Sequence, residues 1–181
     1  MYTGVFLDQR YVYGRAGLID DLRQAVVARA QANKNFLLFL ATNALEQKPP
    51  LNWMGRLAPI PSGEHAGKLD LKMSGIVPIT GLARYYALAA GSTAVNTRER
   101  LEVASQGGAI SSRQAHDLMD ALDYLCGLRL QHQARRMSDG HAADNYLDPA
   151  ELSSFERRHL THAFALVRGL QRSISQLYPV N

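Results

Sequence analysis

The strongest constraint on the fold comes from two helix-start signals, each followed by apolar residues at helical spacing. Ser111 with Gln114 and Ser153 with Glu156 form capping boxes, in which side chains satisfy free N–H groups at the start of a helix. The first predicted helix runs to about residue 137. The second carries a continuous apolar stripe: Leu160, Ala163, Phe164, Val167, Leu170, Ile174 and Leu177. Two long amphipathic helices need other apolar surfaces to pack against.

Weaker signals upstream predict helices over about 20–47, 78–91 and 97–107. Pro49-Pro50 ends the first of these, and Asn96 or Thr97 caps the third. Between the first two, residues 53–72 contain prolines and glycines but few helix signals, which predicts a loop or a short irregular hairpin.

The N-terminal residues follow a different pattern. Residues 5–14 are rich in strand formers, yet no second strand follows to pair with them. They form either a strand of a sheet in a domain that precedes Met1 or an ordered arm. The predicted fold class is therefore mainly α: an antiparallel four- to five-helix bundle with a short insertion and a strand-like N-terminal junction.

Composition narrows the class of protein. The chain has 181 residues, of which 46% are hydrophobic, and this suits one main domain. The net charge of +4 is mild and dispersed, which disfavours a nucleic-acid binder and leaves anionic small molecules open. Cys126 is the only cysteine, so no internal disulfide can form, as expected for a cytoplasmic protein. No apolar run approaches the roughly 20 residues that span a bilayer.

One segment of the predicted insertion has an unusual charge pattern. Charged and apolar residues alternate in the order Lys68, Leu69, Asp70, Leu71, Lys72 and Met73. An extended backbone sends the three charges to one face and the three apolar side chains to the other. The charged face is a candidate wall of an anion-binding site.

A second unusual pattern lies on the helix that begins after Ser111. Its apolar stripe continues at the same spacing into Arg129, His132 and Arg136, and charged groups on such a stripe need a partner or a ligand. The candidate substrate- or phosphate-binding residues are Lys68, Asp70, Lys72, Asn96, Arg98, Arg129, His132, Gln133, Asn145 and Tyr146.

Each candidate also has a structural interpretation. The charges of residues 68–72 suit a surface ion pair, Asn96 suits a helix cap, and Arg129 suits a buried pair with Asp70 or Asp144. The spaced acids of residues 117–123 could imitate a metal-binding face, but such acids on a surface helix are usually solvated. The two histidines of residues 159–162 have no Cys, Asp or Glu nearby in the sequence to complete a zinc site. No nucleophile motif, phosphate loop or dinucleotide fingerprint occurs, so no catalytic residue and no metal ligand is predicted.

Taken together, several segments resemble a known family. They are residues 7–14, 67–72 with 78–79, 96–101, 128–133, 144–149 and 152–160. In this order and spacing they resemble the C-terminal helical domain, a nucleotidyltransferase substrate-binding domain, of bacterial CBS-domain signal-transduction nucleotidyltransferases. Those proteins are similar to the protein-PII uridylyltransferase group.

The resemblance implies that residues 1–16 join an absent nucleotidyltransferase domain preceding Met1, and that residues 17–181 form the helical domain. It implies Mg²⁺ and a nucleoside triphosphate in the absent domain, no cofactor in this chain, and a protein or small-molecule acceptor. This chain by itself is then expected to be inactive and to form one wall of the active-site cleft.

Two other functions are considered. The bundle could be a regulatory or dimerisation module, in a homodimer, that relays the state of CBS or cyclic-nucleotide-type sensor domains, with its polar residues purely structural. A nucleic-acid-binding bundle would use the basic residues Arg129, Arg135, Arg136, Arg157 and Arg158, and would bind with steep salt dependence.

Overall fold

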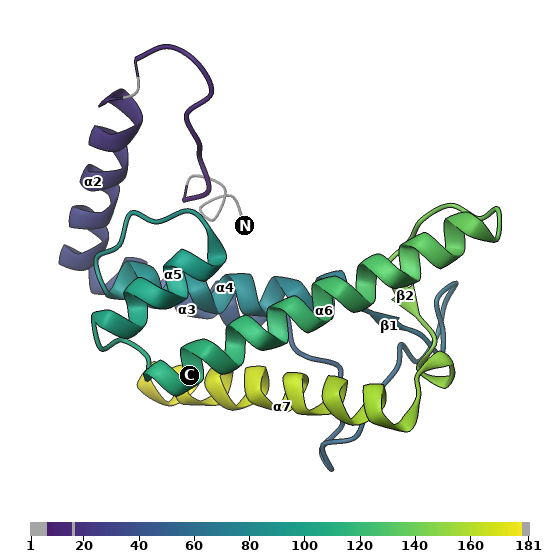
Figure 1. Ribbon diagram of the computed structural model, residues 1–181. Coiled ribbons are helices and arrows are strands. Elements are labelled where there is room, and N and C mark those ends of the chain that lie inside the picture. The colour runs from purple at the N-terminus through teal and green to yellow at the C-terminus, as the bar shows by residue number, and fades with distance from the viewer. Residues whose placement is uncertain (1–6, 16, 179–181) are drawn as a thin grey trace.

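Six α-helices make up most of the described part of the protein (Figure 1). The computed structural model describes residues 7–15 and 17–178. The helices are α2 (Gly17–Ala32), α3 (Lys34–Glu46), α4 (Val77–Ala89), α5 (Thr97–Gln106), α6 (Ser112–Ser138) and α7 (Ser154–Leu177). The shorter elements are β1 (Leu69–Asp70), the π-helical turn η1 (Lys72–Ile76), β2 (Tyr146–Leu147) and the 3₁₀ turn η2 (Pro149–Glu151).

The predicted mainly α fold is confirmed. Both capping boxes are present, at Ser111 with Gln114 and at Ser153 with Glu156. In Figure 1 α6 and α7 run side by side in opposite directions, and α3 packs against both α4 and α7. The apolar stripe of α7 is buried from Leu160 to Ile174, whereas Leu177, predicted to belong to it, is exposed.

The predicted single helix over 20–47 is wrong, because the helix is interrupted between Ala32 and Lys34. Asn33 has an extended backbone, and its side chain accepts hydrogen bonds from the N–H groups of Asn35 and Phe36. An asparagine side chain that caps in this way starts a new helix. As a result α2 diverges from the other helices at one end of the molecule (Figure 1), and the described residues contain one α-helix more than the largest number predicted.

The charged segment after Gly67 is extended for only part of its length. Leu69 and Leu71 are buried, as the alternation predicts, but Met73 is 42% exposed. The alternation ends because the chain enters η1 at Lys72 and continues directly into α4. Gly75 in η1 fits against α6 and α7: a Cβ there would lie 3.2 Å from a methyl group of Leu125.

The N-terminal segment is an arm within its described residues. Residues 7–15 contain no strand, and Val5 and Phe6 of the predicted strand lie outside the described residues. The arm contacts the bundle through Leu7, which packs on the core, and through Asp8. Val12 and Tyr13 further along it are almost fully exposed.

Candidate functional site

The polar end of the α6 stripe bonds to the loop that precedes β2. Arg129 Nε donates to Asn145 Oδ1 at 2.6 Å, and Gln133 Nε2 donates to the same oxygen at 3.2 Å. His132 Nε2 lies 2.8 Å from Asp144 Oδ1. We call this group, completed by Arg136, the α6 cluster: Arg129, His132, Gln133, Arg136, Asp144 and Asn145.

Asp144 carries the negative charge of the α6 cluster. Partial desolvation raises the pKa of its carboxyl, but hydrogen bonds from His132 and the Tyr146 N–H, with the charge of Arg136 at 3.1 Å, outweigh this and hold the pKa below its usual value. An ionised carboxylate only accepts hydrogen bonds, so His132 donates through Nε2. Its Nδ1 is buried and has no hydrogen-bond partner among the described residues.

The charged segment of residues 68–72 lies next to the α6 cluster. β1 pairs antiparallel with β2, which sets Asp70 opposite Tyr146, and the Leu71 N–H donates to the Asn145 carbonyl at 2.9 Å. Asp70 Oδ1 accepts from the N–H groups of Lys72 and Met73, so its side chain caps η1. It forms no ion pair with either lysine in the described part of the chain, and the predicted surface ion pair is therefore wrong.

Tyr146 of β2 is partly covered by a side chain from the insertion between α3 and α4. The ring of His65 stacks on it with 3.4 Å between centroids and 16° between planes. Lys68 is half-buried and Lys72 is exposed. Eight of the ten predicted site residues therefore belong to one end of the bundle, around β1, β2 and the second half of α6.

The other two predicted residues lie at the start of α5. The Asn96 side chain accepts from the N–H groups of Arg98 and Glu99 and caps the helix, which agrees with its structural interpretation. Arg98 forms an ion pair with Asp123 on α6, and both side chains are about half exposed. These two residues are separate from the α6 cluster and lie beside a second polar network.

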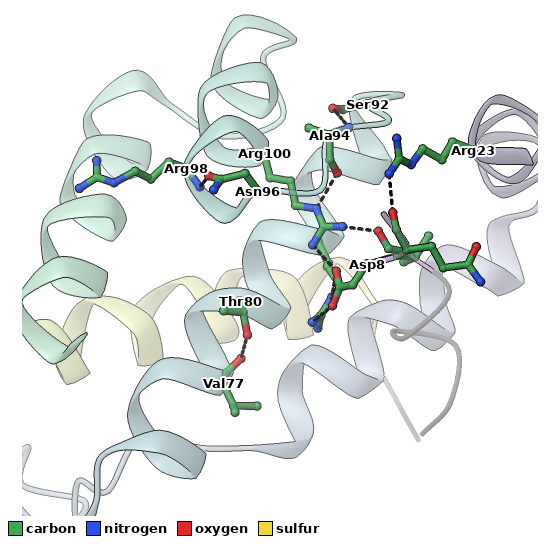
Figure 2. A network of polar contacts seen from close by, with 12 residues as sticks. Asp8, Arg23, Val77, Thr80, Ser92, Ala94, Asn96, Arg98 and Arg100 are labelled. Atoms are coloured by element: carbon green, nitrogen blue, oxygen red, sulfur yellow. Dashed lines mark hydrogen bonds and ion pairs between the residues drawn. The ribbon is translucent and has the colours of Figure 1, made fainter. Parts of the chain in front are cut away.

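This second network, the arm cluster, joins Asp8 of the arm to Arg100 of α5 (Figure 2). Arg84 of α4 pairs with the same aspartate. Arg100 is only 4% exposed, and it donates to Asp8 Oδ1 at 2.7 Å, the Leu7 carbonyl at 2.6 Å and the Ala94 carbonyl at 2.8 Å. Arg84 makes a two-nitrogen contact with the same carboxylate. Every acceptor of Arg100 is therefore in the arm or in the loop before α5.

The arm cluster sets one carboxylate against two guanidinium groups. Partial desolvation raises the pKa of the Asp8 carboxyl, but hydrogen bonds and charge from Arg84 and Arg100 hold it below its usual value. Burial lowers the pKa of the Arg100 guanidinium, and Asp8 opposes that shift. The single carboxylate of Asp8 thus bridges the two arginines that α4 and α5 bring together, and one positive charge stays uncompensated.

Sequence reasoning missed Arg84 and Arg100. Both pair with Asp8 of the arm. A signal for Arg100 was present, because it lies one turn before the buried Ala104 and next to the buried Leu101 on α5. Arg129 was considered as a partner of Asp70 or Asp144, but its bond is to the neutral Asn145.

No three acidic, histidine or cysteine side chains in the ranges 7–15 and 17–178 are grouped to hold a metal ion. Every helix in those ranges is also too short or too polar to span a bilayer.

The fold is mainly helical and holds two polar clusters, the arm cluster near the N-terminus and the α6 cluster. Residues 34–178 match the family described as "Putative nucleotidyltransferase substrate binding domain". The chain belongs to this family. The matched range begins with α3, so the arm and α2 precede it. No curated protein and no solved structure shows a significant match to the chain.

Proposed function

We propose that this chain forms one wall of the active-site cleft of a nucleotidyltransferase involved in signal transduction, and that it contacts the acceptor without itself catalysing the transfer. Membership of the family implies association with a nucleotidyltransferase domain. That domain, preceding Met1, would bind the nucleoside triphosphate and Mg²⁺. The metal's chemistry would be to stabilise the charge that develops on the transferred phosphate.

The observation that carries the proposal is the gathering of cations at one end of the bundle. Lys68 and Lys72 have no acidic partner among the described residues, and the hydrogen bond of Arg129 uses only Nε, which leaves its terminal nitrogens available. The neutral Asn145 orients Arg129 without neutralising it. Charge-assisted hydrogen bonds from such groups suit phosphate or an acidic acceptor.

His132 and Gln133 have a different role in this proposal. Their hydrogen bonds to Asp144 and Asn145 lie inside the α6 cluster, so they position the loop that leads into β2. Asn145 and Tyr146 then act by shaping the wall. Asp70 caps η1 and holds the backbone of Lys72 in place.

The test uses the chain joined to its nucleotidyltransferase domain. We expect Mg²⁺-dependent release of pyrophosphate from a nucleoside triphosphate, with a small-molecule extract as the source of acceptor, to fall about tenfold or more when Lys68 and Lys72 are both changed to glutamate. Arg172→Glu, in an exposed position near the C-terminal end of α7, makes the same kind of charge change at the opposite end of the bundle (Figure 1) and should leave the rate unchanged. An unchanged rate in the double variant would refute the proposal.

One observation favours the second candidate function, a regulatory or dimerisation module. Most polar groups of the α6 cluster bond to one another, as expected of a structural lock. In that case the Lys68 and Lys72 variants would leave transfer intact, and Asp144→Ala would change its response to the sensor domains.

A further inference from the structure

A basic groove lies on the bundle outside both polar clusters. It has a volume of about 820 Å³ and lies between the first half of α7 and the loop that follows α3. Its lining includes Arg56, Pro59, Pro149, Arg157, Arg158 and His162. The loop and the helix are in contact, because Arg168 of α7 donates to the Asn52 carbonyl at 2.8 Å.

The charge of this groove is unbalanced. Three arginines line it, and none of the described lining residues is acidic. Arg56, Arg157 and Arg158 take part in none of the ion pairs found within residues 7–15 and 17–178, whereas Arg84, Arg98, Arg100, Arg135 and Arg136 do. Like charges gathered in a concave surface raise the local concentration of anions.

Two of the arginines extend from well-defined backbone. Arg157 donates to the carbonyl of Pro149 at 2.9 Å and to that of Leu152 at 3.4 Å. These bonds fix its guanidinium beside the N-terminus of α7. On the opposite wall Asn52 Oδ1 accepts from the N–H groups of Met54 and Arg56, which closes the turn that carries Arg56. Preorganised donors lose less entropy when they bind a ligand.

The groove has the size and chemistry of a site for a phosphorylated small molecule. Its volume is within the range of about 300–1,000 Å³ typical of ligand sites. The planar guanidinium matches two phosphate oxygens at once, and three of them suit more than one phosphate group. We infer that this groove binds the acceptor substrate through its phosphate groups. The identification of the ligand as the acceptor rests on the proposed function, whereas the binding of a phosphorylated molecule in the groove does not.

Binding is tested on the 181-residue chain with inorganic pyrophosphate as the probe. Trp53 is the only tryptophan, is 88% exposed and lies in the same turn as Arg56, so its fluorescence reports on the groove alongside calorimetry. We expect pyrophosphate to bind more tightly than inorganic phosphate. Arg56→Ala and Arg158→Ala should each weaken binding about tenfold, as the loss of one charge-assisted contact predicts.

Arg172→Ala is the matched control. It removes the same charge from an exposed position on α7 outside the groove lining and should leave pyrophosphate binding unchanged. The side chains of Arg56 and Arg158 make no hydrogen bond to the described residues, so both variants should fold, and an unchanged melting temperature checks this.

Three results would overturn the inference: no binding of pyrophosphate, an equal loss of binding in Arg172→Ala, or binding of single-stranded RNA that strengthens with its length and falls steeply with salt. The last result would identify a nucleic-acid groove. None of these results bears on the Lys68 and Lys72 transfer assay. Conversely, pyrophosphate binding together with a failed transfer assay would leave the groove intact and refute the proposed function.

Discussion

The α6 cluster and the arm cluster each bury one basic side chain, but they connect the chain over very different distances. His132 and Arg129 bond to residues 12 and 16 positions later. Arg84 and Arg100 bond to Asp8, which lies 76 and 92 positions earlier. The first cluster closes a local loop, whereas the second ties the N-terminal arm to two helices. Similar polar contacts therefore stabilise a local loop in one region and attach a distant segment of the chain in the other.

The clusters also differ in the groups that pair with their cations. In the α6 cluster a half-buried Asp144 meets one histidine and one arginine, and Asn145 orients the remaining arginine without charge. In the arm cluster a single Asp8 meets two arginines, and backbone carbonyls supply the other acceptors. The arm cluster thus depends on a segment that precedes the family match, and the α6 cluster does not.

The largest expected effect is that of Arg100→Met, which removes the buried cation of the arm cluster. We expect a loss of about 3 kcal/mol in the free energy of unfolding, because the carbonyls of Leu7 and Ala94 lose their donor and Asp8 loses one of two cations. Urea unfolding followed by circular dichroism measures it. Arg98→Met, which breaks only the exposed pair with Asp123, should cost less than about 1 kcal/mol. Equal losses in the two variants would show that the arm cluster is not anchored by Arg100.

Asp144→Ala should cost about 2 kcal/mol, because it leaves the buried Nε2 of His132 without an acceptor. The same unfolding measurement applies, with Asp139→Ala, an exposed acid at the end of α6, as the control. If Asp144→Ala lost no more stability than its control, the α6 cluster would not hold the loop before β2. Of the two clusters, only the arm cluster would then contribute to stability.

Asn96→Ala should cost about 1 kcal/mol, the usual effect of losing an N-cap side chain. Asn96→Ser should restore most of this stability, because serine caps almost as well. Transfer activity of the serine variant separates the two interpretations of Asn96: unchanged activity supports the cap alone, and a loss of activity with normal stability would indicate contact with substrate.

The smallest expected effect is a loss of folding stability in acid, as Asp8 and Asp144 become protonated. Both carboxyls have a folded-state pKa below the unfolded value of about 3.9. Their contribution to stability is therefore fully present above that unfolded value and is lost as the pH falls through the lower folded pKa. Asp8→Asn and Asp144→Asn should each flatten the fall in stability below about pH 4. Parallel curves for wild type and both variants would contradict this assignment.

Local signals in the sequence predicted much of the fold. The capping boxes at Ser111 and Ser153 marked the starts of α6 and α7, and Asn96 marked that of α5, because a cap acts within three residues of its own position. Asn33 is also such a cap, but apolar residues on both sides of it suggested one continuous helix. The extended pattern of residues 68–73 was correct only to Leu71, because η1 follows directly.

The candidate site was predictable where a residue type broke a periodic pattern. Arg129 and His132 stood out because they occupy core positions of an otherwise apolar stripe, and the structure places both against the loop before β2. Arg84 and Arg100 did not stand out, since their partner is nearly half the chain away. The basic groove was missed for the same reason, because Arg56 and Arg157 approach only when the loop after α3 packs on α7.

The sequence by itself determined the mainly α class, most helix boundaries and the membership of polar residues in the α6 stripe. These depend on interactions within a few turns of one helix, whose geometry is the same in any fold. The tertiary structure alone decided that Asp8 joins Arg84 and Arg100 and that three arginines line one groove. Such contacts depend on how helices pack, and packing brings together residues whose separation along the chain carries no local signal.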